Sequence, residues 1–97
     1  MNRDEACDLI ERPRAVRMLV ALLETPNDAP VSDLLEAVGG SRSTGLNRLE
    51  EFREAGLIEK RAGHNRTIYS LTDLGEEVTH HLVDGIDVIQ EGNDDDC

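Results

Sequence analysis

Between Ser41 and Arg48 the chain gathers side chains that suit the edges of nucleic-acid bases and phosphate oxygens. An arginine can donate two parallel N–H bonds to guanine, and an asparagine matches adenine in the same bidentate way. Arg48 and Asn47 are therefore candidates for base contacts, and Arg42 is a candidate for either kind of contact. Short hydroxyls and backbone N–H groups at a helix start suit phosphate. The candidate set is Ser41, Arg42, Ser43, Thr44, Asn47 and Arg48.

A simpler interpretation of this stretch is a helix cap followed by a solvated face. Serine and threonine favour helix starts whether or not a ligand is present, because their hydroxyls accept from free backbone N–H groups. The exposure of Arg42, Arg48 and Arg66 distinguishes a DNA-binding surface from a protein-interaction module. A DNA-binding surface needs them free, whereas a protein-interaction module allows them to pair with neighbouring carboxylates such as Glu51.

A second group of polar and basic side chains follows, between two short apolar segments. It consists of Arg61, His64, Asn65 and Arg66. A flexible tip with two arginines suits the narrow, electronegative minor groove of A-tracts. The alternative is an ordinary charged hairpin turn, in which Arg61 pairs with Glu59.

The charge of the chain is unevenly distributed. There are 21 acidic and 10 basic residues, and the net charge is −11. Residues 41–66 nevertheless carry six basic side chains against four acidic ones, a local charge of +2, so the remainder carries −13. This asymmetry indicates one anion-facing surface. Nine arginines against a single lysine, in so acidic a chain, also suggest a cytoplasm of high salt, where long-range repulsion of DNA is screened.

Several classes of protein are disfavoured by composition. No apolar run approaches the roughly 18 residues of a membrane span, and we expect a cytoplasmic protein without a signal peptide. Phe52 and Tyr69 are too few to stack single-stranded bases. We find no phosphate-cradling loop or catalytic triad, so no enzyme activity and no cofactor are predicted. Cys7 and Cys97 do not form a disulfide framework, and a redox role for them is weakly supported.

His80, His81 and Asp84, with Glu77 nearby, are the candidate metal ligands of the last predicted helix. Two histidines and a carboxylate can form part of a zinc site. Adjacent helix positions differ by about 100°, so the two histidines cannot easily bind one ion within a chain. We therefore predict no metal site, and expect these side chains to be solvated or paired.

The hydrophobic pattern predicts the elements that must position the candidate residues. A helix opens at Arg12-Pro13 and ends before residue 25, with one apolar stripe. Ser32 is predicted to cap a short helix over 33–38, which Gly39-Gly40 ends. A third helix runs from Ser41 or Arg42 to about residue 55.

The period then changes from that of a helix to that of a strand. Residues 57–61 and 67–71 are predicted strands, joined by a hairpin loop over 62–66. Thr72 is predicted to cap a last helix that runs to about residue 90. Residues 1–8 are expected to be loose or a short helix, and 91–97 a solvated tail.

Three stretches carry a resemblance to a known group. Residues 32–44 resemble the helix-turn-helix of the MarR and ArsR superfamilies, as do residues 49–58, and residues 69–75 resemble the junction after their wing. The resemblance implies an α+β, mainly α, winged helix-turn-helix with a three-helix core, a two-stranded wing and a C-terminal dimerisation helix. It implies that the helix after the turn enters the major groove of double-stranded DNA. The domain boundaries that follow are 1–12 for a polar extension, 13–72 for the winged domain, 73–91 for the last helix and 92–97 for an acidic tail.

Two positions depart from the pattern of that group. Gly45 replaces a β-branched core residue, and Leu46 replaces a polar one. Either Leu46 supplies the missing core contact, with a slight rotation of the helix, or it touches a thymine methyl group. The base-reading positions are therefore uncertain by about one residue.

The last helix carries a long apolar face, which predicts a homodimer on a palindromic operator. Its residues are Leu74, Val78, Leu82, Ile86 and Ile89. The alternative is that this face only closes the core of one chain. The function expected from the sequence is a DNA-binding transcription regulator, more readily a repressor because so short a chain leaves little room for an activation domain. The alternative is a winged-helix protein-interaction module. An effector ligand is not indicated.

Overall fold

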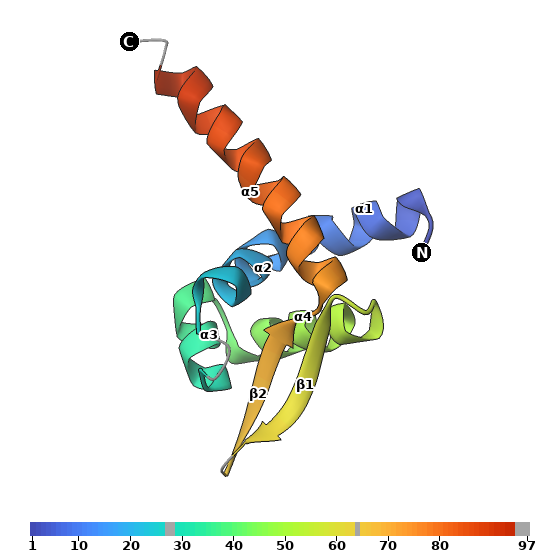
Figure 1. The fold of residues 1–97 in the computed structure, drawn as a ribbon, viewed down its shortest axis with the longest axis vertical. Helices are drawn as coiled ribbons and strands as arrows, with labels where there is room; N and C mark the ends of the chain where they lie inside the picture. Colours follow the sequence, from blue (N-terminus) through green and yellow to red (C-terminus); the bar gives the residue numbers. More distant parts are fainter. Residues whose placement is uncertain (27–28, 64, 95–97) are drawn as a thin grey trace.

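The computed structural model describes residues 1–26, 29–63 and 65–94. The elements follow in the order α1 (Arg3–Glu11), α2 (Ala15–Glu24), α3 (Val31–Val38), α4 (Arg42–Glu54), β1 (Ile58–Gly63), β2 (Arg66–Leu71) and α5 (Asp73–Asp94). Helices α2, α3 and α4 form a three-helix core, β1 and β2 form a hairpin beside it, and α5 rises from the core at the opposite end (Figure 1). This confirms the predicted mainly helical α+β class and the winged helix-turn-helix.

The first helix, α1, is more than a loose extension. The Asn2 side chain accepts a hydrogen bond from the Glu5 N–H at 2.8 Å, and acidic residues occupy the first turn, where the helix dipole favours them. Leu9, which is 5% exposed, joins the hydrophobic core. Residues 1–11 therefore belong to the folded body, and the helix is longer than the predicted segment over 1–8.

Two predicted helix starts are wrong by one to three residues. Helix α2 begins at Ala15 rather than at Pro13. Arg14 adopts a left-handed φ of 67°, which is incompatible with an α-helix that runs through it. Helix α3 begins at Val31, so Ser32 lies inside the first turn and does not cap it. The extended residue before α3, Pro30, forms a bridge to Ile68 in β2, and this contact sets where the helix starts.

The hairpin is tighter than predicted. Its register pairs Ile58 with Leu71 at one end and Gly63 with Arg66 at the other. The strands therefore reach residues 63 and 66, and the connection between them is shorter than the expected loop over 62–66. Asn65 has a φ of 58°, the left-handed conformation that such short turns require.

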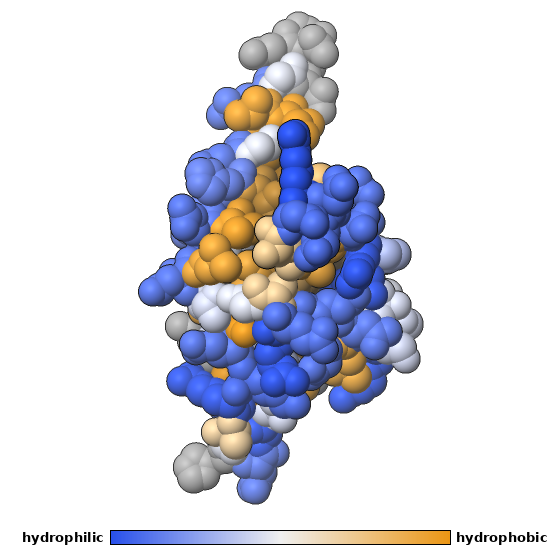
Figure 2. Space-filling view, turned by 90° about the vertical axis from the view of Figure 1, so that its right-hand side faces the viewer, coloured by the Kyte–Doolittle hydropathy of each residue, from blue (hydrophilic) through white to orange (hydrophobic). Residues whose placement is uncertain are grey.

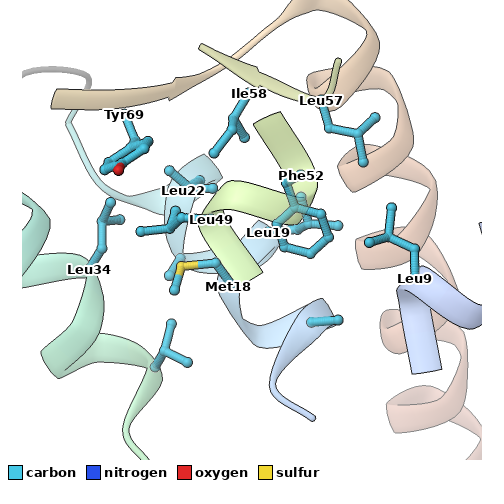
Figure 3. Close-up of a cluster of buried hydrophobic side chains, with 13 residues drawn as sticks. Leu9, Met18, Leu19, Leu22, Leu34, Leu49, Phe52, Leu57, Ile58 and Tyr69 are labelled. Carbon is cyan, nitrogen blue, oxygen red and sulfur yellow. The ribbon is translucent and has the colours of Figure 1, made fainter. Parts of the chain in front are cut away.

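The core lies where α1, α2, α3, α4 and the hairpin meet (Figure 3). Leu19 and Met18 of α2 and Leu49 and Phe52 of α4 are each 0% exposed, and Tyr69 closes the core beneath the hairpin. The other buried members are Leu9, Ala15, Ala21, Leu22, Leu34, Val38, Leu57 and Ile58. Burial of large side chains from every neighbouring element fixes the orientation of α4.

The last helix, α5, begins at a side-chain cap and extends well past the core. The Thr72 hydroxyl accepts from the Gly75 N–H at 3.1 Å and donates to the Gly56 carbonyl at 2.7 Å, which confirms the predicted cap. The helix continues to Asp94, so the first part of the predicted tail is helical, while residues 95–97 lie outside the described residues. In the part of the chain that the structure describes, no helix combines the length and apolarity needed to cross a membrane.

Candidate nucleic-acid interface

One face of α4 packs against the core, so the opposite face is the one available to a ligand. Gly45, Leu49 and Phe52 recur at helical spacing and are all buried. The opposite face presents Ser43 and Asn47, both exposed. These two predicted contact residues therefore point away from the core.

Gly45 lies where α4 crosses α3. A Cβ atom built on Gly45 would stand 2.2 Å from Leu35 Cδ2, so the Leu35 side chain of α3 occupies the space that a side chain at this position would take. The glycine thus lies on the core face itself, and Leu46 is a half-buried residue packed against the core beside it. The departure noted in the sequence is explained by close helix packing.

Two hydroxyls of the candidate set form the cap of α4. Ser41 Oγ accepts from the Thr44 N–H at 3.1 Å and donates to Thr44 Oγ1 at 2.8 Å. This is the simpler interpretation of both residues, and it orients the start of the helix. Arg42, the first residue of α4, is exposed.

Arg48 lies apart from the other candidates. Its side chain is 12% exposed, its Nε stands 2.6 Å from Glu51 Oε1, and its Nη1 donates to the Pro13 carbonyl at 3.4 Å. Arg12 also pairs with Glu51. The Arg48 guanidinium is therefore directed along the body of the protein, toward the connection between α1 and α2.

Two arginines of the wing are free of ion pairs. Arg61 and Arg66 are exposed, and neither they nor Arg42 form an ion pair with any residue that the structure describes. Asn65 is exposed at the turn. His64 lies outside the described residues.

A cluster of three charges joins the wing to α4. Glu50 accepts two hydrogen bonds from Arg53, at 2.9 and 3.2 Å, and Lys60 of β1 lies 3.8 Å from Glu50. The hydrogen bond from Arg53 lowers the pKa of Glu50, and Glu50 in turn raises the pKa of Arg53. The Glu50 carboxylate is thus stabilised in its ionised form and paired with one cation of α4 and one of the wing.

Arg14 is a basic residue near this surface that the sequence patterns did not select. It donates to the Val38 carbonyl at 3.2 Å, and its side chain lies over the Gly39–Gly40 turn that precedes α4. The sequence pattern places Arg14 inside the helix predicted to open at Arg12-Pro13, and no local signal indicates its left-handed conformation. The contact to α3, 24 residues away, places it there.

The predicted apolar face of α5 divides into two parts. Val78 and Leu82 pack against the core, whereas Leu74 is 51% and Ile89 66% exposed. Ile86 lines an open groove of about 770 Å³ between α5 and α2. Figure 2 shows apolar surface continuing up α5, flanked by hydrophilic side chains. Val88, in the same distal part of α5, is 67% exposed.

The histidine and carboxylate group of α5 has no metal-binding geometry. Among the described residues, no three histidine, cysteine, aspartate or glutamate side chains come together as ligands. His80 and His81 are both exposed on the helix. Cys7 is an exposed free thiol on α1, and Cys97 lies outside the described residues.

Comparison with solved structures places the chain among winged-helix proteins. A possible HxlR family transcriptional factor from Thermoplasma volcanium superimposes with a TM-score of 0.80 at 23% identity, covering 96% of this chain and 86% of that one. Rv0081 of M. tuberculosis gives 0.70 at 27% identity, covering 92% and 90%. Sso10a-2, a DNA-binding protein from Sulfolobus solfataricus, gives 0.66 at 15% identity, covering 84% of each chain.

The sequence comparisons add no family assignment. No protein-family model matches the chain, and no curated protein matches it. The structural likeness therefore supports the winged helix-turn-helix without selecting the MarR or ArsR superfamilies. At these identities the likeness establishes the shared fold.

Proposed function

We propose that this protein is a transcription regulator that binds double-stranded DNA through α4 and the wing. One observation carries the proposal: exposed arginines without ion pairs among the described residues occupy both the start of α4 (Arg42) and the wing (Arg61, Arg66) of a chain whose net charge is −11. A surface of this kind suits a polyanion. The Thermoplasma and Sulfolobus neighbours, described as a possible transcriptional factor and a DNA-binding protein, support the same conclusion.

The exposed residues of α4 suit contacts within the major groove. Asn47 can pair with adenine and Arg42 with guanine or phosphate, while Ser43 suits phosphate oxygens. Ser41 and Thr44 support them by capping the helix. Arg48 is set apart from the reading residues because Glu51 and Pro13 hold its guanidinium.

The wing supplies the second contact. Arg61 and Arg66, with the turn at Asn65, suit the DNA backbone or a narrow minor groove. Ile58 and Tyr69 of the hairpin are buried in the same core as α4, and Lys60 pairs with Glu50, so both elements can meet one duplex. Acting in the cytoplasm, such a protein would occupy a promoter and repress it.

The distal part of α5 supports a homodimer. Ile86 and Ile89 expose apolar surface that the core of one chain does not cover. A second copy docked along α5 would bury this surface and present two α4 helices to DNA, as a palindromic operator requires.

The protein-interaction alternative retains one supporting observation. Arg48 pairs with Glu51, and Arg53 with Glu50, which is the pairing that a module without DNA contacts would show. Under this alternative the acidic surface would receive a basic protein partner. The two proposals differ in the role of Arg42 and Arg66.

Selection of sheared genomic DNA by the purified protein, in about 1–3 M KCl to screen the acidic surface, tests the proposal. Arg42→Gln and Asn47→Ala should abolish enrichment of the selected sites. Arg3→Gln is the matched control, because it removes one exposed arginine from α1, outside the proposed surface. Failure of the folded wild-type protein to enrich any site would reject the DNA-binding proposal and favour the interaction module.

A further inference from the structure

The connection between α1 and α2 touches the helix-turn-helix at two places. Arg12 pairs with Glu51 in the last turn of α4, and the Pro13 carbonyl accepts from Arg48 one turn earlier, at the middle of the helix. Arg14, the next residue, donates to the Val38 carbonyl at the end of α3. Three consecutive residues thus tie the end of α3 and the middle of α4 to a segment outside the helix-turn-helix.

Glu51 is the centre of this network. Its carboxylate meets Arg12 through one oxygen and Arg48 through the other. Arg48 Nε and Glu51 Oε1 are both shielded from solvent, and their 2.6 Å contact is ionic rather than an aligned hydrogen bond. A shielded guanidinium without a counter-ion is costly, so removal of Glu51 would drive Arg48 outward into solvent.

We infer that Glu51 is a positioning residue of the proposed DNA interface: it withholds the Arg48 guanidinium from DNA and holds α4 against the α1–α2 connection. The inference rests on the proposed function of α4. Residue types alone make Arg48 a reader of bases, whereas in the structure its Nε pairs with Glu51 and its Nη1 donates to the Pro13 carbonyl. With Arg48 held back, discrimination between sequences depends on Arg42 and Asn47.

This role predicts an unusual effect of Glu51→Gln. The variant should release Arg48 to contact a phosphate, so binding to a random-sequence duplex should strengthen. The slope of log K against log salt concentration should become steeper by about 0.9, the change expected for one added phosphate contact. The ratio of operator binding to random-sequence binding should fall about tenfold, because α4 loses its fixed approach to the bases.

Glu54→Gln is the matched control. Glu54 lies one turn further along α4, is exposed, and forms no ion pair with the described residues. Its substitution makes the same change in net charge, and the salt slope should stay at the wild-type value. The double variant Arg48→Gln, Glu51→Gln should lose the added slope of Glu51→Gln, because no guanidinium is then released.

A second measurement needs no DNA. In the free protein, exchange of the Arg48 Nε–H with solvent, followed by ¹⁵N NMR, should be at least about tenfold slower than that of the exposed Arg42. Glu51→Gln should bring the two rates together, and Glu54→Gln should leave them apart. Equal rates in the wild-type protein would overturn the inference.

The two measurements separate the inference from the proposed function. If the wild-type protein binds no duplex while Arg48 remains protected, the DNA-binding proposal fails and the structural role of Glu51 stands. If the protein binds DNA and Arg48→Gln alone removes operator recognition without altering exchange across α4, Arg48 reads bases directly and the inference is wrong. An unchanged salt slope in Glu51→Gln would also reject it.

Discussion

Lys60 Nζ in the wing lies 3.8 Å from Glu50 Oε1 in α4, and this contact joins the two elements proposed to hold DNA. The same carboxylate is bonded by Arg53, one turn along α4. All three side chains are substantially exposed, so the cluster contributes orientation more than stability. A duplex that approached this surface would meet two cations and one carboxylate whose positions are already linked.

The first prediction concerns the ionisation of Glu50. Arg53→Gln removes the hydrogen bond that lowers the pKa of Glu50, so this pKa should rise toward its ordinary value. Because the pKa is lowered in the folded protein, the contribution of the pair is present above the ordinary pKa and is lost as pH falls through the lowered one. A ¹³C NMR titration of the Glu50 carboxyl group measures the shift. Arg61→Gln serves as the control, and an equal rise in that variant would disprove the assignment to Arg53.

The second prediction concerns Gly75, at the start of α5. A Cβ atom there would stand 1.9 Å from the Leu57 carbonyl oxygen, which is backbone and cannot move aside cheaply. Gly75→Ala should lower the free energy of unfolding by about 3 kcal/mol. Gly85→Ala, in the same helix with nothing within 4 Å, should raise it by up to about 1 kcal/mol. Chemical denaturation measures the free energy of unfolding of both variants. An equal change in the two variants would contradict the packing argument.

The third prediction tests the crossing of α3 and α4. Gly45→Ala should force the Leu35 side chain to repack, because the added methyl group would meet Leu35 Cδ2 at 2.2 Å. We expect a loss of about 1–3 kcal/mol in the free energy of unfolding, together with weaker DNA binding. Leu35→Ala should restore much of both losses when combined with Gly45→Ala, since it removes the clashing atom. A double-mutant cycle measures this coupling, and simple additivity of the two substitutions would show that the clash is not their cause.

The fourth prediction tests the distal face of α5. Ile89→Asp places a charge in the exposed apolar surface and should convert the proposed homodimer to a monomer, measured by sedimentation velocity. His80→Asp is the matched control, since it adds an acidic residue about 180° around the same helix. A wild-type protein that sediments as a monomer at every concentration would reject the dimer.

Local signals in the sequence predicted most of the fold. Helical periodicity and helix caps are signals that lie within a few residues of one another in the sequence. The structure confirms the caps at Ser41, before α4, and at Thr72, before α5. Local signals did not predict the backbone conformation where it depends on contacts between segments that are distant in the sequence. Pro13 is a favourable first residue of a helix, yet the contact of Arg14 with Val38 places the start at Ala15. The connection in the hairpin is likewise shorter than the predicted loop, because strand pairing extends to Gly63 and Arg66. Strand propensity did not indicate this extension.

The candidate site divides in the same way. The sequence by itself determined that a locally basic segment with Arg42 and Asn47 would begin a helix, because residue types and caps act over one or two turns. It also allowed Arg48 to pair with Glu51 or to face a ligand, since both are compatible with helical spacing. Only the tertiary structure decided between them. Arg12 and the Pro13 carbonyl, 39 and 35 residues from their partners in α4, contact the two members of the pair, and these contacts depend on the packing of the whole chain.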